Sequence, residues 1–330
     1  MSSTSTVDGV LVQWGERLFY PRNRIVKVAP LPRLDTLVRR QAAVIRRRIE
    51  ATVTKRAPQV MVKVTGGGRG MGAITAHFRY ISKNGRLAFE DDRCGIHQEK
   101  EALHDLAEQW RLGGSLIGDT SPRREAFNLM LSMPRGTDAQ IVLRAAREFA
   151  QIELKDHRYV MVLHEHQENP HVHLSVRAES MDGKRLNPRK VDLHRWRETF
   201  AERLRGYGVK AEATRQAIRG EGRRFESLWQ RKAGEEGRLR NIADPWKSGD
   251  AYQCSRIAAL DAWAHIVEAL RASDQVSDHE LARRISSFVR ESSYAKETVR
   301  QRNREVPERA RARVVAPVVP RDRPGPEIRR

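Results

Sequence analysis

Three histidines flank a short polar connection between two apolar segments. Residues 158–163 and 171–177 have the valine-rich composition of strands, and the connection between them is short enough for an antiparallel hairpin. Side chains alternate between the two faces of a strand, so His171 and His173 project to the same side. The hairpin brings His164, at the end of the first strand, level with this pair. The spacing therefore predicts three imidazoles converging on one divalent metal, with open positions for water or a phosphate oxygen.

A tyrosine among basic residues supplies a second element of this chemistry. A metal beside a phosphodiester makes the phosphorus a better electrophile, but a nucleophile is still required. Tyr80 stands near the end of a helix expected over 71–82, close to Arg79, Lys83 and Arg86. These cations would favour the phenolate and hold a phosphate backbone. Taken alone, Tyr80 is more simply explained as a core residue, and the histidine hairpin is what favours a nucleophile.

Two better-known site patterns are absent from the sequence. The glycine cluster at 66–72 follows an expected strand, but no Gly-Lys-Ser/Thr comes after it, so we expect no nucleotide-binding loop and no ATPase motor. The segment 164–168 has Glu168 where a helical zinc-protease motif requires its second histidine. The segment is also expected to be a strand, so we reject the protease interpretation.

The overall charge predicts a polyanionic partner. Lys and Arg number 62 against 42 Asp and Glu, which gives a formal charge of +20 and a pI near 10.7. We expect nucleic acid, because a membrane-surface protein would need a lipidation signal or a basic amphipathic anchor, and no lipidation signal is found. No export signal or membrane-spanning run is found either, so we expect a cytoplasmic protein without membrane insertion. Cys94 and Cys254 form no disulfide framework.

Expected strands and helices alternate through the middle of the chain and favour an α+β fold, a sheet layered with helices. We predict strands at 59–65, 125–133, 158–163 and 171–177, and helices at 71–82, 99–110, 138–151 and after 187. The predicted parts are a basic N-terminal extension with one amphipathic helix (1–58), a catalytic domain (59–220), a helical C-terminal region (221–303) and a disordered tail rich in Pro and Arg (304–330).

The helix expected at 35–53, which follows a polar coil, carries a group of arginines. These are Arg39, Arg40, Arg46, Arg47 and Arg48. They are explained either as a solvated basic face or as contacts with nucleic-acid phosphates, and the sequence leaves both explanations open.

The histidine hairpin and the tyrosine helix resemble the motifs of the conjugative relaxases. These are mobilisation nucleases of the HUH endonuclease superfamily, and the resemblance is greatest to the class of the plasmid mobilisation proteins and the T-DNA border nuclease. The family pattern His-x-Asp-x-x-x-Pro-His-hydrophobic-His is met by His164, Pro170, His171, Val172 and His173. The glycine-rich strand end and the helix after it resemble the family's nucleophile motif, and this resemblance implies that Tyr80 is the nucleophile. Ser132 resembles a serine that lies near the cleaved site in relatives. The resemblance covers 59–209, about half the chain.

The resemblance implies that a mainly antiparallel sheet carries the metal and that single-stranded DNA at a transfer origin is nicked. Tyr80 would form a 5′-phosphotyrosyl link, and the free 3′-hydroxyl would later reseal the strand without ATP. Magnesium or manganese is favoured, and zinc stays open because three imidazoles also suit it. Plasmid mobilisation in a bacterium, from a gene on a mobile element, is the implied process, with accessory relaxosome and coupling proteins as partners.

One position departs from the family pattern, because His166 stands where relatives usually have Asp. The general base is therefore open between His166, Glu168 and His77, which lies three residues before Tyr80 on the expected helix. Two other functions remain. A rolling-circle replication initiator or transposase of the same superfamily shares the chemistry, and an inactive basic DNA-binding accessory protein would keep only the fold.

Overall fold

A computed structural model describes residues 3–20, 36–165, 168–222, 233–234, 236–238 and 249–297 of the chain. Its helices are α1 (Ser3–Phe19), α2 (Thr36–Val53), α3 (Met71–Ile81), α4 (Lys100–Leu112), α5 (Ala139–Glu153), α6 (Lys190–Gly206), α8 (Asp250–Arg271) and α9 (Val276–Glu291). Its strands are β1 (Met61–Gly66), β2 (Phe89–Asp91), β3 (Ile96–His97), β4 (Ala126–Ser132), β5 (His157–His164) and β6 (His171–Ser180). The tail predicted as disordered, 304–330, and His166 lie outside the described residues. None of the described helices is long and apolar enough to span a bilayer.

The strands form one sheet in the order β1-β4-β6-β5-β2-β3. Every pairing between them is antiparallel. This confirms the predicted α+β fold with a central antiparallel sheet. The sequence does not predict β2 and β3, because they are too short to develop an alternating pattern.

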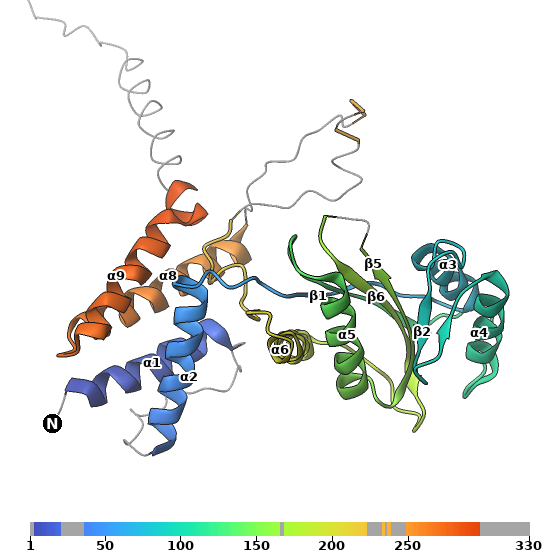
Figure 1. The fold of residues 1–330 in the computed structure, drawn as a ribbon, viewed down its shortest axis with the longest axis horizontal. Helices are drawn as coiled ribbons and strands as arrows, with labels where there is room; N and C mark the ends of the chain where they lie inside the picture. Colours follow the sequence, from blue (N-terminus) through green and yellow to red (C-terminus); the bar gives the residue numbers. More distant parts are fainter. Residues whose placement is uncertain are drawn as a thin grey trace, which may run out of the picture.

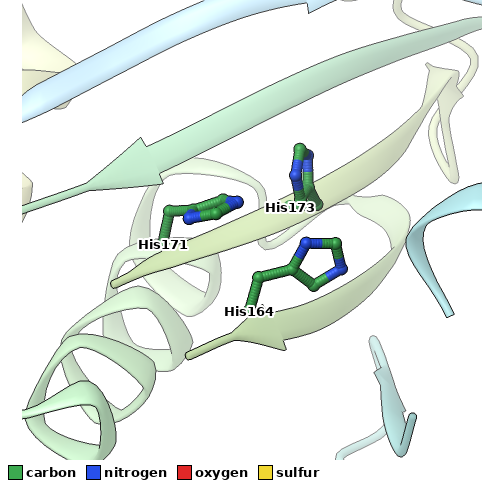
Figure 2. Close-up of side chains that lie close together, drawn as sticks. All are labelled: His164, His171 and His173. Atoms are coloured by element: carbon green, nitrogen blue, oxygen red, sulfur yellow. The ribbon is translucent and has the colours of Figure 1, made fainter. Parts of the chain in front are cut away.

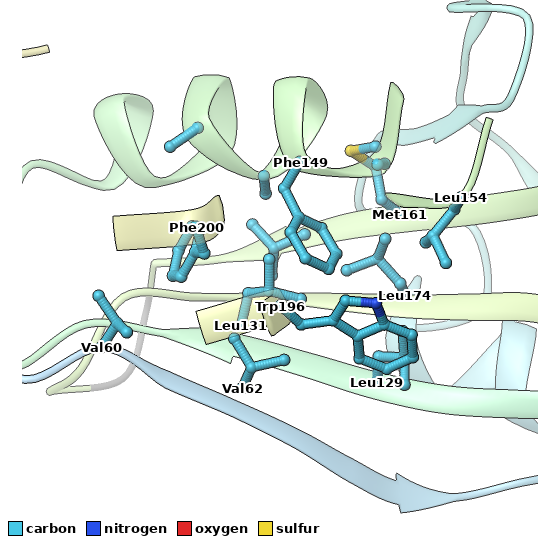
Figure 3. Close-up of a cluster of buried hydrophobic side chains, with 14 of the residues drawn as sticks. Val60, Val62, Leu129, Leu131, Phe149, Leu154, Met161, Leu174, Trp196 and Phe200 are labelled. Carbon is cyan, nitrogen blue, oxygen red and sulfur yellow. The ribbon is translucent and has the colours of Figure 1, made fainter. Parts of the chain in front are cut away.

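One face of the sheet is apolar and is sealed by α5 and α6. Side chains at alternate strand positions, among them Leu129, Leu131 and Leu174, are fully buried on this face. Phe149 of α5 meets the Trp196 ring of α6 edge-on, with ring centroids 6.2 Å apart. Figure 3 shows these aromatic rings filling the space between the helices and the strands. The core therefore fixes the register of the strands that carry the functional side chains.

The opposite face is covered by α3 and α4 over part of its area. Val160 and Val162 of β5 are buried beneath these helices, together with Phe78 and Trp110. Phe78 and Trp110 meet edge-on, with their centroids 4.9 Å apart. Figure 1 shows α3 and α4 on the side of the sheet away from α5. The histidine ends of β5 and β6 lie on the same face.

The glycine cluster makes a tight turn between β1 and α3. Gly70 has φ +98°, a backbone conformation that favours glycine, and a Cβ atom there would lie 2.3 Å from the Asp119 carbonyl oxygen. A Cβ on Gly67 would lie 2.3 Å from the Ala126 carbonyl oxygen. The close approach of the 118–126 backbone therefore accounts for these glycines without a bound nucleotide. The turn aims α3, and with it Tyr80, across the sheet.

The helices α1, α2, α8 and α9 form a second apolar core, which we call the helical cluster (Figure 1). It draws on both ends of the described chain: Leu11 and Ile45 pack with Trp263 and Ile285. Residues 3–19, expected as coil, form a helix. The prediction fails because the apolar residues of α1 are interrupted by glycines and gain their burial only from the other three helices.

Candidate metal centre and nucleophile

Three imidazoles converge at one end of the sheet, as the hairpin spacing predicts. In the register of β5 and β6, His164 lies opposite His171, and His173 lies opposite Val162. The imidazole centroids are 4.6 Å apart for His164 and His173, 4.9 Å for His171 and His173, and 5.2 Å for His164 and His171. One nitrogen from each ring lies within 4.8 Å of the others. Figure 2 shows the three rings, His164 on one strand and the other two on its neighbour, turned toward a common point.

Two of the rings, those of His164 and His171, are hydrogen-bonded to backbone carbonyl oxygens. His164 Nε2 lies 2.7 Å from the Ile81 carbonyl oxygen, and His171 Nδ1 lies 2.9 Å from that of Asn169. Each carbonyl accepts a hydrogen bond from its ring, so His164 carries its proton on Nε2 and His171 carries its proton on Nδ1. The other nitrogen of each ring then presents its lone pair. Metal-binding histidines are commonly oriented in this way.

The third ring is buried among other imidazoles without a counter-charge. Burial first, and then the neighbouring His164, His171 and His77, lower the pKa of His173 to about 3. His173 is therefore neutral near pH 7. Its Nδ1 is buried and has no hydrogen-bond partner in the described structure. A desolvated, neutral nitrogen beside two others fits a divalent cation, which would supply the missing partner.

Tyr80 projects from α3 directly beside this cluster. The buried residues of α3, Met71, Ile74, Phe78 and Ile81, recur on one face. Tyr80 is on another face and is 70% exposed. Its ring centroid lies 6.4 Å from that of His173 and 6.4 Å from that of His77. A core role for the tyrosine is thus excluded, and the phenol lies within reach of a phosphate at the imidazoles.

The hydrogen bond between His164 and the Ile81 carbonyl connects strand β5 to helix α3. His164 is the metal-ligand candidate on β5, and Ile81 follows Tyr80 in α3. The position of the phenol relative to the cluster is therefore fixed by a backbone carbonyl. Sequence reasoning missed this contact, because a carbonyl carries no residue-type signal.

The predicted DNA-binding residues are divided between the surface and the core. Arg79, Lys83 and Arg86 are exposed around the end of α3. Ser132 is buried beside His171, its partner in the β4–β6 register. The Ser132 hydroxyl lies 3.4 Å from the carbonyl oxygen of Pro170. Ser132 therefore adjoins the imidazoles, whereas the three cations are exposed to solvent next to Tyr80 in the sequence or a few residues after it.

The predicted general bases differ in burial and in the side chains that surround them. His77 is half-buried beside Tyr80, and burial lowers its pKa to about 4. Its Nδ1 has no hydrogen-bond partner in the described part of the chain. Glu168 is exposed and its carboxylate lies 3.3 Å from a guanidinium nitrogen of Arg135. The structure therefore brings His77 into the neighbourhood of the phenol and pairs the Glu168 carboxylate with Arg135.

Residues 80–209 match the sequence model described as "Relaxase: MobA/VirD2-like, nuclease domain". The resemblance to the relaxases is confirmed. The relaxase-like segment begins at the exposed Tyr80, includes all three clustered imidazoles and ends just after α6.

A solved structure described as "Molecular Basis of Vancomycin Resistance Transfer in Staphylococcus aureus" is similar to the chain at 14% identity. The similarity covers 48% of this chain and 99% of that one, with a TM-score of 0.31. At this score the likeness supports no inference about the relaxase-like segment. None of the curated proteins matches the chain.

Proposed function

We propose that this protein nicks and rejoins one strand of DNA at a transfer origin, through a covalent bond to Tyr80. The observation that carries the proposal is the exposed phenol, whose ring centroid lies 6.4 Å from that of His173 in a cluster of three imidazoles. The match to a relaxase nuclease domain over residues 80–209 supports the same chemistry. Mobilisation of a plasmid or similar element in the bacterial cytoplasm is the process we propose.

The chemical step is a transesterification. The Tyr80 oxygen bonds to phosphorus as the phosphorus–O3′ bond breaks, and the phenol proton passes to a base. The departing oxygen takes up a proton and becomes a free 3′-hydroxyl, leaving a 5′-phosphotyrosyl link. The reverse attack by the 3′-hydroxyl reseals the strand without ATP, because the ester conserves the bond energy.

His164, His171 and His173 would hold the divalent metal. When bound, the cation would neutralise charge on the non-bridging phosphate oxygens and make the phosphorus more electrophilic. The carbonyls of Ile81 and Asn169 keep two of the rings oriented toward it. We propose magnesium or manganese from the family resemblance, and a zinc-loaded sample tests the remaining alternative.

His77 is the base that we propose for the phenol proton. It lies on α3 one turn before Tyr80, and burial keeps its ring neutral near pH 7, so a ring nitrogen has a lone pair for the phenol proton. Glu168 is the second candidate, but its pairing with Arg135 reduces its capacity for this role. Replacing His77 by Gln should slow adduct formation more than replacing Glu168 by Gln, in single-turnover assays. His166, the third candidate, lies outside the described residues.

The partner is single-stranded DNA, held at the cleaved phosphate by the exposed Arg79, Lys83 and Arg86. Accessory relaxosome and coupling proteins complete the proposed assembly. A rolling-circle initiator or transposase would use the same covalent step, so transfer of a plasmid carrying the recovered nick site distinguishes these processes. An inactive accessory protein would bind the DNA without forming an adduct.

The test uses a random-sequence pool of single-stranded DNA labelled at its 3′ end. With Mg²⁺ or Mn²⁺, we expect a denaturation-resistant complex that retains the 3′ label, because the 5′-phosphate of the downstream fragment joins Tyr80. A 5′ label should be released. Tyr80→Phe should abolish the complex while DNA binding persists, whereas Tyr207→Phe, on the far side of the sheet, should not. A covalent complex that persists in Tyr80→Phe would falsify the nucleophile assignment.

A further inference from the structure

One carbonyl in the last turn of α3 is bound by the metal-ligand candidate His164. The last four carbonyls of an α-helix have no partner within the helix. Backbone N–H groups just after α3 occupy three of them, those of Phe78, Arg79 and Tyr80. The fourth carbonyl, that of Ile81, accepts a hydrogen bond from His164 Nε2 at 2.7 Å. His164 therefore caps the helix that carries the nucleophile candidate.

The chain leaves α3 through a left-handed turn, residues 83–85, which the Ser82 side chain holds. Lys83 and Asn84 have φ of +51° and +59°, a region that residues other than glycine rarely adopt, and Gly85 follows with φ +80°. The Ser82 hydroxyl donates to the Phe78 carbonyl at 2.8 Å and accepts the Gly85 N–H at 3.0 Å. Ser82 is 0% exposed, so water does not compete for these two bonds. The buried hydroxyl therefore fixes the direction in which the chain leaves the helix.

The left-handed turn also packs against the residue before α4. A Cβ atom on Gly85 would lie 2.5 Å from the Glu99 carbonyl oxygen, and the Glu99 N–H donates to the Gly85 carbonyl at 2.9 Å. The Leu87 N–H donates back to the Ser82 carbonyl at 2.9 Å. These contacts hold the turn on both sides, and the position of Ser82 in turn determines that of Ile81, the residue before it.

The bond from His164 to the Ile81 carbonyl links metal affinity to the position of the phenol. The proton on Nε2 leaves Nδ1 of His164 for a cation. A cation on Nδ1 would make the Nε2–H group a stronger donor and would strengthen its bond to the carbonyl. Because Tyr80 precedes Ile81, the same bond restrains the phenol beside the imidazoles. By linkage, a group that holds this carbonyl in place raises the affinity for the cation, and the cation holds the end of α3.

We infer that Ser82 is a positioning residue, which holds the Ile81 carbonyl for His164 and thereby couples metal binding to the placement of Tyr80. The phenol is then held for attack when the cation is present. This inference rests on the metal site of the proposed function. It does not rest on the covalent step, because the coupling concerns only the cation and the end of α3.

The first test measures Mn²⁺ binding to the full chain by calorimetry, without DNA. Ser82→Ala should weaken the affinity about fivefold, the scale on which a residue between two sites changes their coupling. Ser82→Thr keeps the hydroxyl and should bind Mn²⁺ more tightly than Ser82→Ala does. Thermal unfolding of each variant checks that it is folded at the temperature of the measurement.

The matched control is Ser292→Ala, at the end of α9. Like Ser82, Ser292 is the first residue after its helix and is buried, and its hydroxyl donates to a carbonyl of the last turn, that of Val289, at 2.6 Å. This variant should lose stability but keep the Mn²⁺ affinity of the unmodified chain. An unchanged affinity in Ser82→Ala, or an equal loss in both variants, would overturn the coupling and leave the metal site in place.

The second test needs no variant and measures amide hydrogen exchange in the unmodified chain. Saturation with Mn²⁺ should slow exchange of the Asn84 and Leu87 amides about fivefold, because their bonds close the turn and linkage is reciprocal. The Ser292 amide should be unaffected. Unchanged exchange at the turn would overturn the coupling even if Ser82→Ala does not fold. A chain that binds no Mn²⁺ would overturn both the metal site and the coupling, while the Tyr80 adduct decides the covalent step separately.

Discussion

The imidazole cluster and the arginines of α2 show how different surroundings give basic side chains different roles. Among the described residues, the side chains that could bind a metal around His173 are all imidazoles, and no carboxylate belongs to this group. On α2, by contrast, the inward-facing arginines meet carboxylates: Arg46 pairs with Asp278 on α9, and Arg48 pairs with Glu198 on α6. One cluster is thus left without a counter-charge, and the other is neutralised within the protein.

The difference identifies which basic groups face an external ligand. A buried arginine is tolerated only with a partner, so Arg46 and Arg48 serve to join helices. The two explanations that the sequence left open for this helix, a solvated face and a phosphate contact, then apply only to Arg39, Arg40 and Arg47, which are exposed. Imidazoles can instead be buried neutral, and their lone pairs remain available for a metal.

The largest effect should come from removing two of the imidazoles. His171→Ala combined with His173→Ala should reduce metal-dependent nicking by about 1000-fold, because a metal contributes several kcal/mol to transition-state stabilisation. It should also abolish Mn²⁺ binding, measured by calorimetry on the protein alone. His104→Ala, on the exposed surface of α4, is the control. Unchanged Mn²⁺ binding in the double variant would show that the cluster is not the metal site.

A smaller effect, on stability alone, should follow from removing the ion pair between Arg46 of α2 and Asp278 of α9. The Asp278 side chain is only 4% exposed, so Arg46→Ala leaves a buried carboxylate without its main partner. We expect a loss of about 3 kcal/mol in the free energy of unfolding, measured with urea. The adjacent exposed Arg47→Ala should change it by less than about 0.5 kcal/mol. Similar losses in the two variants would contradict the distinction drawn between paired and exposed arginines.

The smallest effect, on the pH dependence of stability, should come from His194, a buried imidazole outside the cluster of three histidines. Burial, and then Arg48, lower its pKa to about 4, so it is neutral in the folded chain. The unfolded chain binds a proton below about pH 6.5, and stability is therefore lost as the pH falls from 6.5 toward 4. Between pH 7 and pH 5, His194→Gln should lose about 1–2 kcal/mol less than the unmodified chain.

His265→Gln, on the exposed side of α8, provides the control for this measurement. Parallel pH profiles for the unmodified chain and His194→Gln would show that the His194 imidazole is not held neutral. Burial alone thus lowers the pKa of an imidazole, whereas a metal site also requires other imidazoles to converge on it.

The sequence determined the local part of the site. Alternation along a strand puts His171 and His173 on one face whatever the rest of the chain does, and a short connection brings His164 level with them. The same local rules predicted β1, β4, β5 and β6, because their apolar residues have a clear period. They did not predict β2 and β3, which are stabilised by pairing with β5 and with each other rather than by their own pattern.

Tertiary structure decided the relations between distant segments. The distance from Tyr80 to His173 depends on how α3 crosses the sheet, which the glycine turn and the Ile81 carbonyl set. The separate roles of Arg46 and Arg47 depend on α9, more than 200 residues away in the chain. A pattern of residue types fixes which side of its own element a side chain occupies, but only packing determines which other element it meets.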